Sequence, residues 1–245
     1  MPFTFAHPAI VLPLGNLSKR WFSLTGLVIG SMTPDFEYFI RMRVKSIYSH
    51  TLTGLFWFDL PLGLILVYIY LRWVKKPLID HLPKPLNERL SSFKAHSIDI
   101  GFSWMYFAVL SVSILIGTAS HLLWDGFTHP TGYFVSAVPI LKHIEHIGSH
   151  QVYTYKLFQH LSTLLGLAVI LIATFKLPKH RQILHVDISS YWFQTAGVTA
   201  ITLLIRLLSG LSYRQYGHVV VTAIAGFWLG LLLASVLSLR KGRLD

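Results

Sequence analysis

The sequence predicts an all-α integral membrane protein: a helix bundle with about five firm spans and an irregular helix pair at the N-terminus. Of its 245 residues, 53% are hydrophobic and only 13% are charged, whereas soluble domains carry about 25% charged residues. The mean hydropathy is +0.56. Apolar segments of about 20 residues, the length that crosses a bilayer as a helix, recur along the chain. Together these observations favour a membrane protein over a soluble domain.

Five segments are long and apolar enough to be firm spans: 51–71, 101–124, 155–175, 191–209 and 217–239. A weaker candidate, 22–40, contains GSMTPDFEYF, in which Pro34 and two carboxylates are expected to interrupt a helix. The opening segment 5–14 is too short to span and predicts an interfacial or half-inserted helix. The G-x-x-x-G patterns at 26–30 and 226–230 predict close helix packing within one chain.

The chain contains no low-complexity linker and no internal repeat that we can identify. We therefore expect one membrane domain over residues 1–245. In this division, residues 1–175 carry the candidate site and residues 176–245 add two further spans.

The net charge of +11 comes mainly from short basic clusters between apolar segments. With five spans, the clusters in 72–100, 176–190 and the C-terminal tail fall on one side, which predicts that this side is cytoplasmic. A smaller cluster at 41–45 disagrees with this orientation. We expect membrane lipids and not nucleic acid as the partners of the chain.

Histidines concentrate on the opposite, outer side: His50, His121, His129, His143, His146, His150, His160 and His218. The chain has no cysteine, which excludes disulfides, thiolate metal ligands and cysteine nucleophiles. G-x-S-x-G, P-loop and G-x-G-x-x-G motifs do not occur, so serine hydrolase and nucleotide-binding activities have no motif support.

The stretch SHLLWDGFTHPTG, residues 120–132, places His121, Asp125 and His129 at four-residue intervals. Residues four apart share one face of a helix, so His121 and Asp125 should project together. Pro130 disfavours helical geometry at His129, so the row is expected to end there in a turn. Imidazole with carboxylate suits a divalent ion such as zinc. The alternative is a set of interfacial polar residues that closes a helix.

Four further residues are candidate ligands outside that stretch. Asp35 follows Pro34 in an apolar context, where a carboxylate is costly and usually faces a partner or a wet cavity, although it could instead cap a helix after a break. His50 precedes a firm span, and His160 lies in the first turns of another. His7 lies in the short N-terminal segment.

The segments MPFTFAHPAIVLPL, LVIGSMTPDFEYFI, SHLLWDGFTHPTG and QHLSTLLG resemble a bacterial family of polytopic membrane proteins of unknown function. That family is similar to the YdjM-like membrane-bound metal-dependent hydrolases and, more distantly, to zinc-dependent phospholipase C. The resemblance covers most of residues 1–175 and fades in the last two spans. It implies a protein of the bacterial plasma (inner) membrane, with a metal site made by His7, Asp35, His50, His121 and Asp125. The H-x-x-x-E pair of phospholipase C has no clean counterpart here, so we expect one or two metals instead of three.

These patterns predict a membrane-embedded metal-dependent hydrolase of phosphoesters or lipid-linked substrates, with its site at the outer face. Asp35 and Asp125 are the candidate catalytic carboxylates, because either could accept a proton from water. Arg41 or Arg43 could receive a phosphate oxygen, although such a run more often binds anionic headgroups. The alternative is a non-enzymatic protein in which the same residues bind a structural or transported ion. A haem cytochrome is the third hypothesis, disfavoured because bis-histidine ligation needs histidines deep in facing spans.

Overall fold

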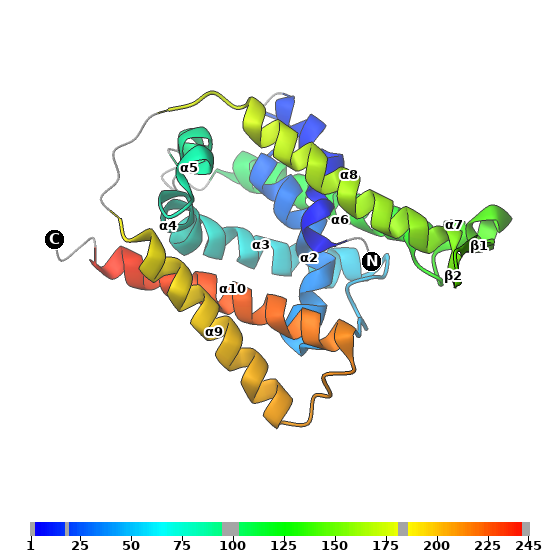
Figure 1. Ribbon diagram of the computed structural model, residues 1–245. Helices are drawn as coiled ribbons and strands as arrows, with labels where there is room; N and C mark the ends of the chain where they lie inside the picture. The colour runs from blue at the N-terminus through cyan, green and yellow to red at the C-terminus, as the bar shows by residue number, and fades with distance from the viewer. Residues whose placement is uncertain (1–2, 18–19, 95–102, 181–185, 242–245) are drawn as a thin grey trace. The chain divides into compact units, whose positions relative to one another are not determined.

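The structure, a computed structural model, describes residues 3–17, 20–94, 103–180 and 186–241 (Figure 1). Residues 101–102 of one predicted span lie outside the described residues. So do residues 95–100, 181–185 and 242–245 of the predicted basic clusters.

Most described residues are helical, as the composition predicts. The longer helices are α2 (Leu24–Arg41), α3 (Leu60–Ile69), α6 (Trp104–Thr128), α8 (Thr154–Lys176), α9 (Ile188–Leu208) and α10 (Tyr216–Lys241). The shorter helical elements are Thr4–Ala6, α1 (Pro8–Val11), Leu12–Asn16, α4 (Lys75–Asp80), α5 (Lys84–Leu90), Ser91–Phe93, α7 (Tyr133–Ala137) and Pro139–Lys142. Strands β1 (Ile144–Ile147) and β2 (His150–Tyr153) form an antiparallel hairpin in which Ile144 lies opposite Tyr153.

Five helical stretches are long and apolar enough to cross a membrane, which confirms the predicted number of spans. They are Leu55–Asp80, Trp104–Ala137, Thr154–Lys176, Ile188–Leu208 and Tyr216–Lys241. The first continues past the predicted end at residue 71, because π-helical turns at Leu55–Asp59 and Tyr70–Val74 keep α3 and α4 in one continuous helix. The segment Thr4–Gly15 is apolar but too short to span, as expected.

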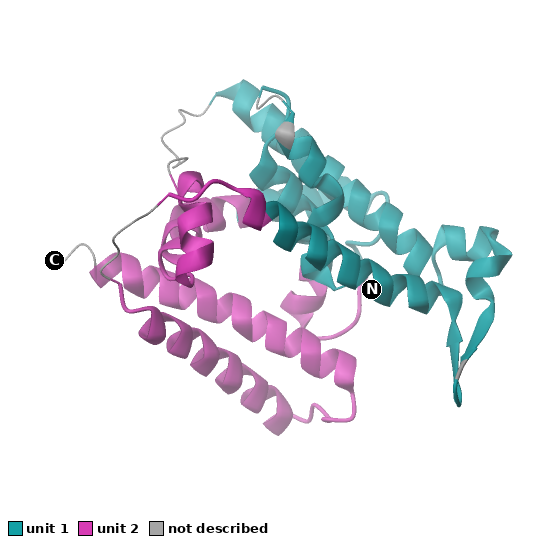
Figure 2. Cartoon of the chain, turned by 45° about the horizontal axis from the view of Figure 1, so that its top comes forward, with its two compact units in different colours: residues 1–35, 48–65, 102–173 teal, residues 36–47, 66–101, 174–245 magenta. Residues whose placement is uncertain are grey.

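The chain forms two compact units, coloured separately in Figure 2. The first unit contains residues 1–35, 48–65 and 102–173, and the second contains residues 36–47, 66–101 and 174–245. The candidate site belongs to the first unit. In the second, α9 and α10 pack side by side as a helical pair (Figure 1).

The glycine patterns mark close helix crossings inside the chain, as predicted. A Cβ atom on Gly30 of α2 would lie 2.3 Å from the carbonyl oxygen of Ile114 on α6. One on Gly117 of α6 would lie 2.4 Å from the carbonyl oxygen of Leu27. Gly230 of α10 similarly approaches the backbone of α9. The missing side chains let α2 and α6 approach closely, which brings the polar residues of the two helices together.

Helix α2 is continuous through Pro34, so the predicted interruption is wrong. A proline inside a helix leaves the carbonyl four residues earlier without its usual N–H donor. Here that carbonyl belongs to Gly30, and it accepts a hydrogen bond of 3.1 Å from the Thr118 hydroxyl on α6. The neighbouring helix thus supplies the donor that Pro34 lacks, as membrane helices require. Asp35 consequently lies inside a helix and does not cap one.

Candidate metal centre

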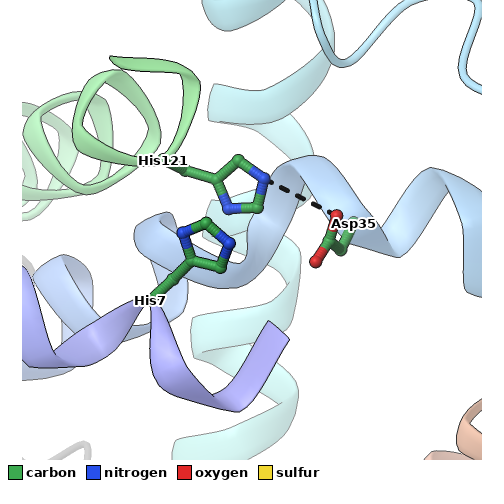
Figure 3. Close-up of side chains that lie close together, drawn as sticks. All are labelled: His7, Asp35 and His121. Atoms are coloured by element: carbon green, nitrogen blue, oxygen red, sulfur yellow. Dashed lines mark ion pairs between the residues drawn. The ribbon is translucent and has the colours of Figure 1, made fainter. Parts of the chain in front are cut away.

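Five side chains from four segments of the first unit converge on one buried cluster. His7 lies at the start of α1, Asp35 on α2, His50 before the first span, and His121 and Asp125 on α6. Figure 3 shows His7, Asp35 and His121 directed toward one another from three helices. Their ligand atoms lie within 4.8 Å of one another, as do those of His50, His121 and Asp125, so each group could hold a metal ion.

The distances between the imidazole nitrogens and the carboxylate oxygens fall in a narrow range. His121 Nε2 lies 3.5 Å from Asp35 Oδ1 and 3.4 Å from Asp125 Oδ2. His50 Nε2 lies 3.7 Å and 3.6 Å from the same two oxygens. His7 Nε2 lies 3.8 Å from Asp125 Oδ1, and its ring stacks on that of His121 with 3.8 Å between centroids.

These separations are close to those between the ligands of one metal ion. A charge-assisted N–H···O hydrogen bond is about 2.7–2.9 Å long, shorter than every distance in the cluster. Two ligands of a tetrahedral zinc ion, with bonds of about 2.0–2.2 Å, lie about 3.3–3.6 Å apart. Within the described residues, His121 Nε2, Asp35 Oδ1 and both oxygens of Asp125 have no hydrogen-bond partner. Buried polar atoms in this condition are rare and call for an explanation.

The backbone determines which nitrogen of His121 faces the cluster. His121 Nδ1 lies 2.8 Å from the carbonyl oxygen of Ser31, which can only accept a hydrogen bond. Nδ1 therefore carries a proton, and Nε2 faces the two carboxylates. This arrangement, in which one nitrogen donates to the protein and the other binds, is usual for metal-ligating histidines.

Two other members of the cluster are oriented in a similar way. The hydroxyl of buried Thr4 donates a hydrogen bond of 2.5 Å to Asp35 Oδ2, which leaves Oδ1 directed at the histidines. His50 Nδ1 lies 2.9 Å from the hydroxyl of Ser49, and its Nε2 faces the carboxylates. These contacts hold the side chains in position without occupying the atoms that converge.

The burial of the cluster makes a charge on its side chains energetically costly. Asp35 and His121 are fully buried, and Asp125 is 6% exposed. Burial lowers the pKa of the His7 imidazole well below its usual range, because the charged form loses its hydration. His7 is therefore neutral, in the form that binds metals. Two buried carboxylates carry a charge of −2 when ionised, which one divalent cation neutralises.

Comparison with known proteins identifies the family of this chain. The profile described as domain of unknown function DUF4184 matches residues 1–236, which include every predicted site residue. The chain belongs to the DUF4184 family. No curated protein and no solved structure matches it.

The DUF4184 chain places the remaining predicted site residues differently. His129 lies beside the cluster, with Nδ1 3.5 Å from Asp125 Oδ2 and 3.2 Å from the Asp125 carbonyl oxygen. Helix α6 ends at Thr128, so the row of side chains stops in a turn at His129, as Pro130 predicts. His160 is exposed on α8 and belongs to neither group of converging ligands in the described part of the chain.

The arginines considered for phosphate binding lie in the second unit of the DUF4184 chain. Arg41 Nε pairs with Glu37 Oε1 at 2.8 Å, which also gives the second carboxylate of α2 a partner. Sequence reasoning did not identify Thr4 and Ser31, which form hydrogen bonds with cluster residues, or Thr118, which bonds to the Gly30 carbonyl of α2. The only signal that the sequence gives for these three residues is a hydroxyl side chain in an apolar segment.

Proposed function

We propose that this DUF4184 protein is a membrane-embedded metal-dependent hydrolase of phosphoesters or lipid-linked substrates, with zinc as its preferred ion. One observation carries the proposal: the ligand atoms of His7, Asp35, His50, His121 and Asp125 converge at separations of 3.4–3.8 Å between imidazole nitrogens and carboxylate oxygens. A mixture of imidazole and carboxylate donors is the set that catalytic zinc sites use. The resemblance to the YdjM-like hydrolases supports the same reaction class.

The geometry favours one ion per chain. Both groups of converging ligands include His121. Its Nδ1 donates to Ser31, so Nε2 alone is available, and one nitrogen lone pair binds one ion. The two groups therefore describe overlapping ligand sets for a single ion.

The cluster is more open on one side, where a substrate and water can approach. The side chain of His50 is 20% exposed and that of His129 is 26% exposed, whereas those of His121 and Asp35 are fully buried. A divalent ion bound there supplies Lewis acidity and lowers the pKa of water toward about 7. Asp125, with 8% of its side chain exposed, lies between the buried and open sides and is placed to accept a proton from water. Because α6 is a candidate span, we expect the substrate to come from the bilayer.

A structural or transported ion is the second candidate, and the burial of His7, Asp35 and His121 favours it. A structural site is closed, whereas a catalytic site keeps a position open for water or substrate. In the structural case, metal binding is coupled to folding, so loss of a ligand lowers the melting temperature sharply.

Metal content tests whether the cluster binds an ion at all. We expect purified protein to contain about one zinc per chain and His121→Asn to lose it, measured by inductively coupled plasma mass spectrometry. His160→Asn is the matched control, because this exposed histidine of α8 lies outside both groups of ligands. Equal metal content in the parent and in His121→Asn would rule out the site.

Replacing Asp125 by Asn tests whether the ion is catalytic. We expect the variant to lose metal-dependent hydrolysis of a generic phosphodiester, bis(p-nitrophenyl) phosphate, while its melting temperature in detergent stays close to that of the parent. Helix packing through small residues and apolar spans supplies most of the stability, so the site is not needed to hold the bundle together. A large fall in melting temperature, with no hydrolysis by the parent under any divalent metal, would favour the structural candidate.

A further inference from the structure

A basic pocket in the second unit, separate from the metal ligands, has a volume of about 280 Å³. It is lined by Arg43, which follows α2, and by residues from the end of α9 through the start of α10: Arg206, Ser209, Gly210, Leu211, Gln215 and His218. Every lining residue belongs to the second unit. No acidic residue lines the pocket, and residues 188–241 contain none.

Two helix ends of the same type position the arginines. At the end of α9, Leu211 N–H donates to the Arg206 carbonyl and Gly210 N–H to that of Leu207, with Gly210 at a φ of +94°. This is a Schellman motif, in which a left-handed residue reverses the chain after a helix. Its closing residue, Leu211, is buried, and the chain returns past Arg206 toward α10.

The end of α2 repeats the motif without a glycine. Arg43 N–H donates to the Tyr38 carbonyl and Met42 N–H to that of Phe39. Met42 takes the left-handed position with a φ of +49°, a conformation that non-glycine residues rarely adopt. The Met42 carbonyl accepts a hydrogen bond of 3.4 Å from the Thr222 hydroxyl on α10. The turn thereby places Arg43 at the pocket.

Arg43, Arg206 and His218 bring hydrogen-bond donors to the pocket. Arg206 Nε is buried without a hydrogen-bond partner in the described part of the chain. The Val44 N–H donates to His218 Nδ1 at 3.5 Å, so the proton of the neutral ring is on Nε2. Neither Arg43 nor Arg206 forms a salt bridge with a described carboxylate. Two guanidinium groups and an imidazole N–H together match the several acceptor oxygens of a phosphate.

The pocket lies where two candidate spans are joined. Helix α9 ends at Leu208 and α10 begins at Tyr216, so the connecting turn is at the level of the lipid headgroups. Tyr213 and Tyr216 are 67% and 76% exposed, which is typical of an aromatic belt at the membrane interface. A phosphate group can reach this position from a lipid headgroup or from the aqueous phase.

We propose that Arg43, Arg206 and His218 form a binding site for the phosphate group of a phospholipid or of a soluble phosphate compound. The site is independent of the metal cluster, so it stands whether or not the protein is a hydrolase. The Asp125→Asn variant should retain it.

Thermal unfolding of the full chain in a non-ionic detergent tests this site with two probes, inorganic phosphate and phosphatidic acid in mixed micelles. Diacylglycerol at the same concentration, which has the acyl chains but no phosphate, is the control. We expect a saturable rise in melting temperature with one probe or both, because a ligand that binds the folded state stabilises it. Saturation by inorganic phosphate indicates a soluble ligand, and saturation by phosphatidic acid only indicates a headgroup.

Substitutions of the pocket arginines test whether phosphate binds in the pocket. Arg43→Gln and Arg206→Gln should each raise the half-saturating concentration about tenfold or more, which is the loss of one charge-assisted hydrogen bond. Arg43→Lys keeps the charge without the planar fork and should weaken binding less than Arg43→Gln. Arg214→Gln is the matched control: its exposed guanidinium packs over Tyr213 in the same turn, and it does not line the pocket.

Two results would overturn the proposal. One is the absence of a saturable shift with either probe. The other is an equal loss of binding in Arg214→Gln, which would mean that the net charge of the turn, and not the pocket, attracts the anion. Unchanged melting temperatures without ligand verify that each variant is folded.

Discussion

In both His121 and Asp35, one side-chain atom faces the other cluster residues and a second atom forms a hydrogen bond outside the cluster. His121 uses Nδ1 for the Ser31 carbonyl, and Asp35 uses Oδ2 for the Thr4 hydroxyl. The inward atoms, Nε2 and Oδ1, are then 3.5 Å apart. Outer hydrogen bonds of this kind fix the orientation of both ligands, and the one that His121 donates also raises the basicity of its Nε2. We therefore expect residues that never contact an ion to control its affinity.

Thr4→Val tests this expectation at a single hydroxyl. The variant keeps the shape of the side chain but removes the donor to Asp35 Oδ2. We expect zinc affinity to fall about 10- to 100-fold, measured by competition with a chromogenic chelator. Thr163→Val is the control, because the Thr163 hydroxyl bonds only to backbone groups of Phe3 and Gln159 in the described chain. Equal effects of the two substitutions would show that Thr4 has no specific part in the site.

At the scale of elements, the crossing of α2 and α6 builds the buried half of the cluster. The same crossing satisfies the Gly30 carbonyl that Pro34 leaves without its helical donor, through the Thr118 hydroxyl. Thr118 and His121 lie on α6 within one turn of each other, and both bond to carbonyls of α2. The proline, the small residues and the polar contacts between helices thus form one structural arrangement.

A double-mutant cycle tests that arrangement. Thr118→Val should cost about 1 kcal/mol of unfolding free energy, because the Gly30 carbonyl loses its donor. In the Pro34→Ala background the cost should be smaller, since residue 34 then supplies its own N–H to the same carbonyl. Unfolding in mixed micelles of increasing SDS fraction gives the four free energies. Costs that are equal in both backgrounds would show that Thr118 does not compensate for Pro34.

Sequence patterns predicted the parts of the site that depend on local periodicity. His121 and Asp125 share a face because a helix repeats every 3.6 residues, and the structure places both in the cluster. His160 also starts a predicted span, but that position does not determine which face is buried, and the structure leaves it exposed. The role of Thr4 depends on a contact with a residue 31 positions away, which periodicity cannot reveal. The inclusion of His7, Asp35 and His50 was implied by resemblance to a family and not by spacing.

At the scale of the whole molecule, hydropathy was sufficient to predict five spans, because each needs only length and apolar composition. The ends of the spans were less predictable. Leu55–Asp80 extends through the exposed residues Arg72 and Lys76, since the long side chains of basic residues can reach the interface from within a helix. Orientation in the membrane stays a prediction from the basic clusters.

The absence of native cysteine allows a direct test of orientation. We expect a membrane-impermeant maleimide to label His150→Cys in the β1–β2 hairpin of intact cells, and to label Lys84→Cys only after permeabilisation. Residue 84 lies in the basic segment between the first two spans, and residue 150 lies between the second and third. Both residues are exposed, so accessibility in the folded chain is matched. The reverse labelling pattern would invert the proposed topology.

The converging ligands lie far apart in the sequence, so bringing them together costs the chain conformational entropy. His7 and Asp125 lie 3.8 Å apart although more than a hundred residues separate them along the chain. Joining two points so far apart costs an unfolded chain about 4–5 kcal/mol of conformational entropy. In a chain without cysteine, the packing of the helices has to offset this cost, so the folded bundle closes the loop before an ion can bind to the cluster.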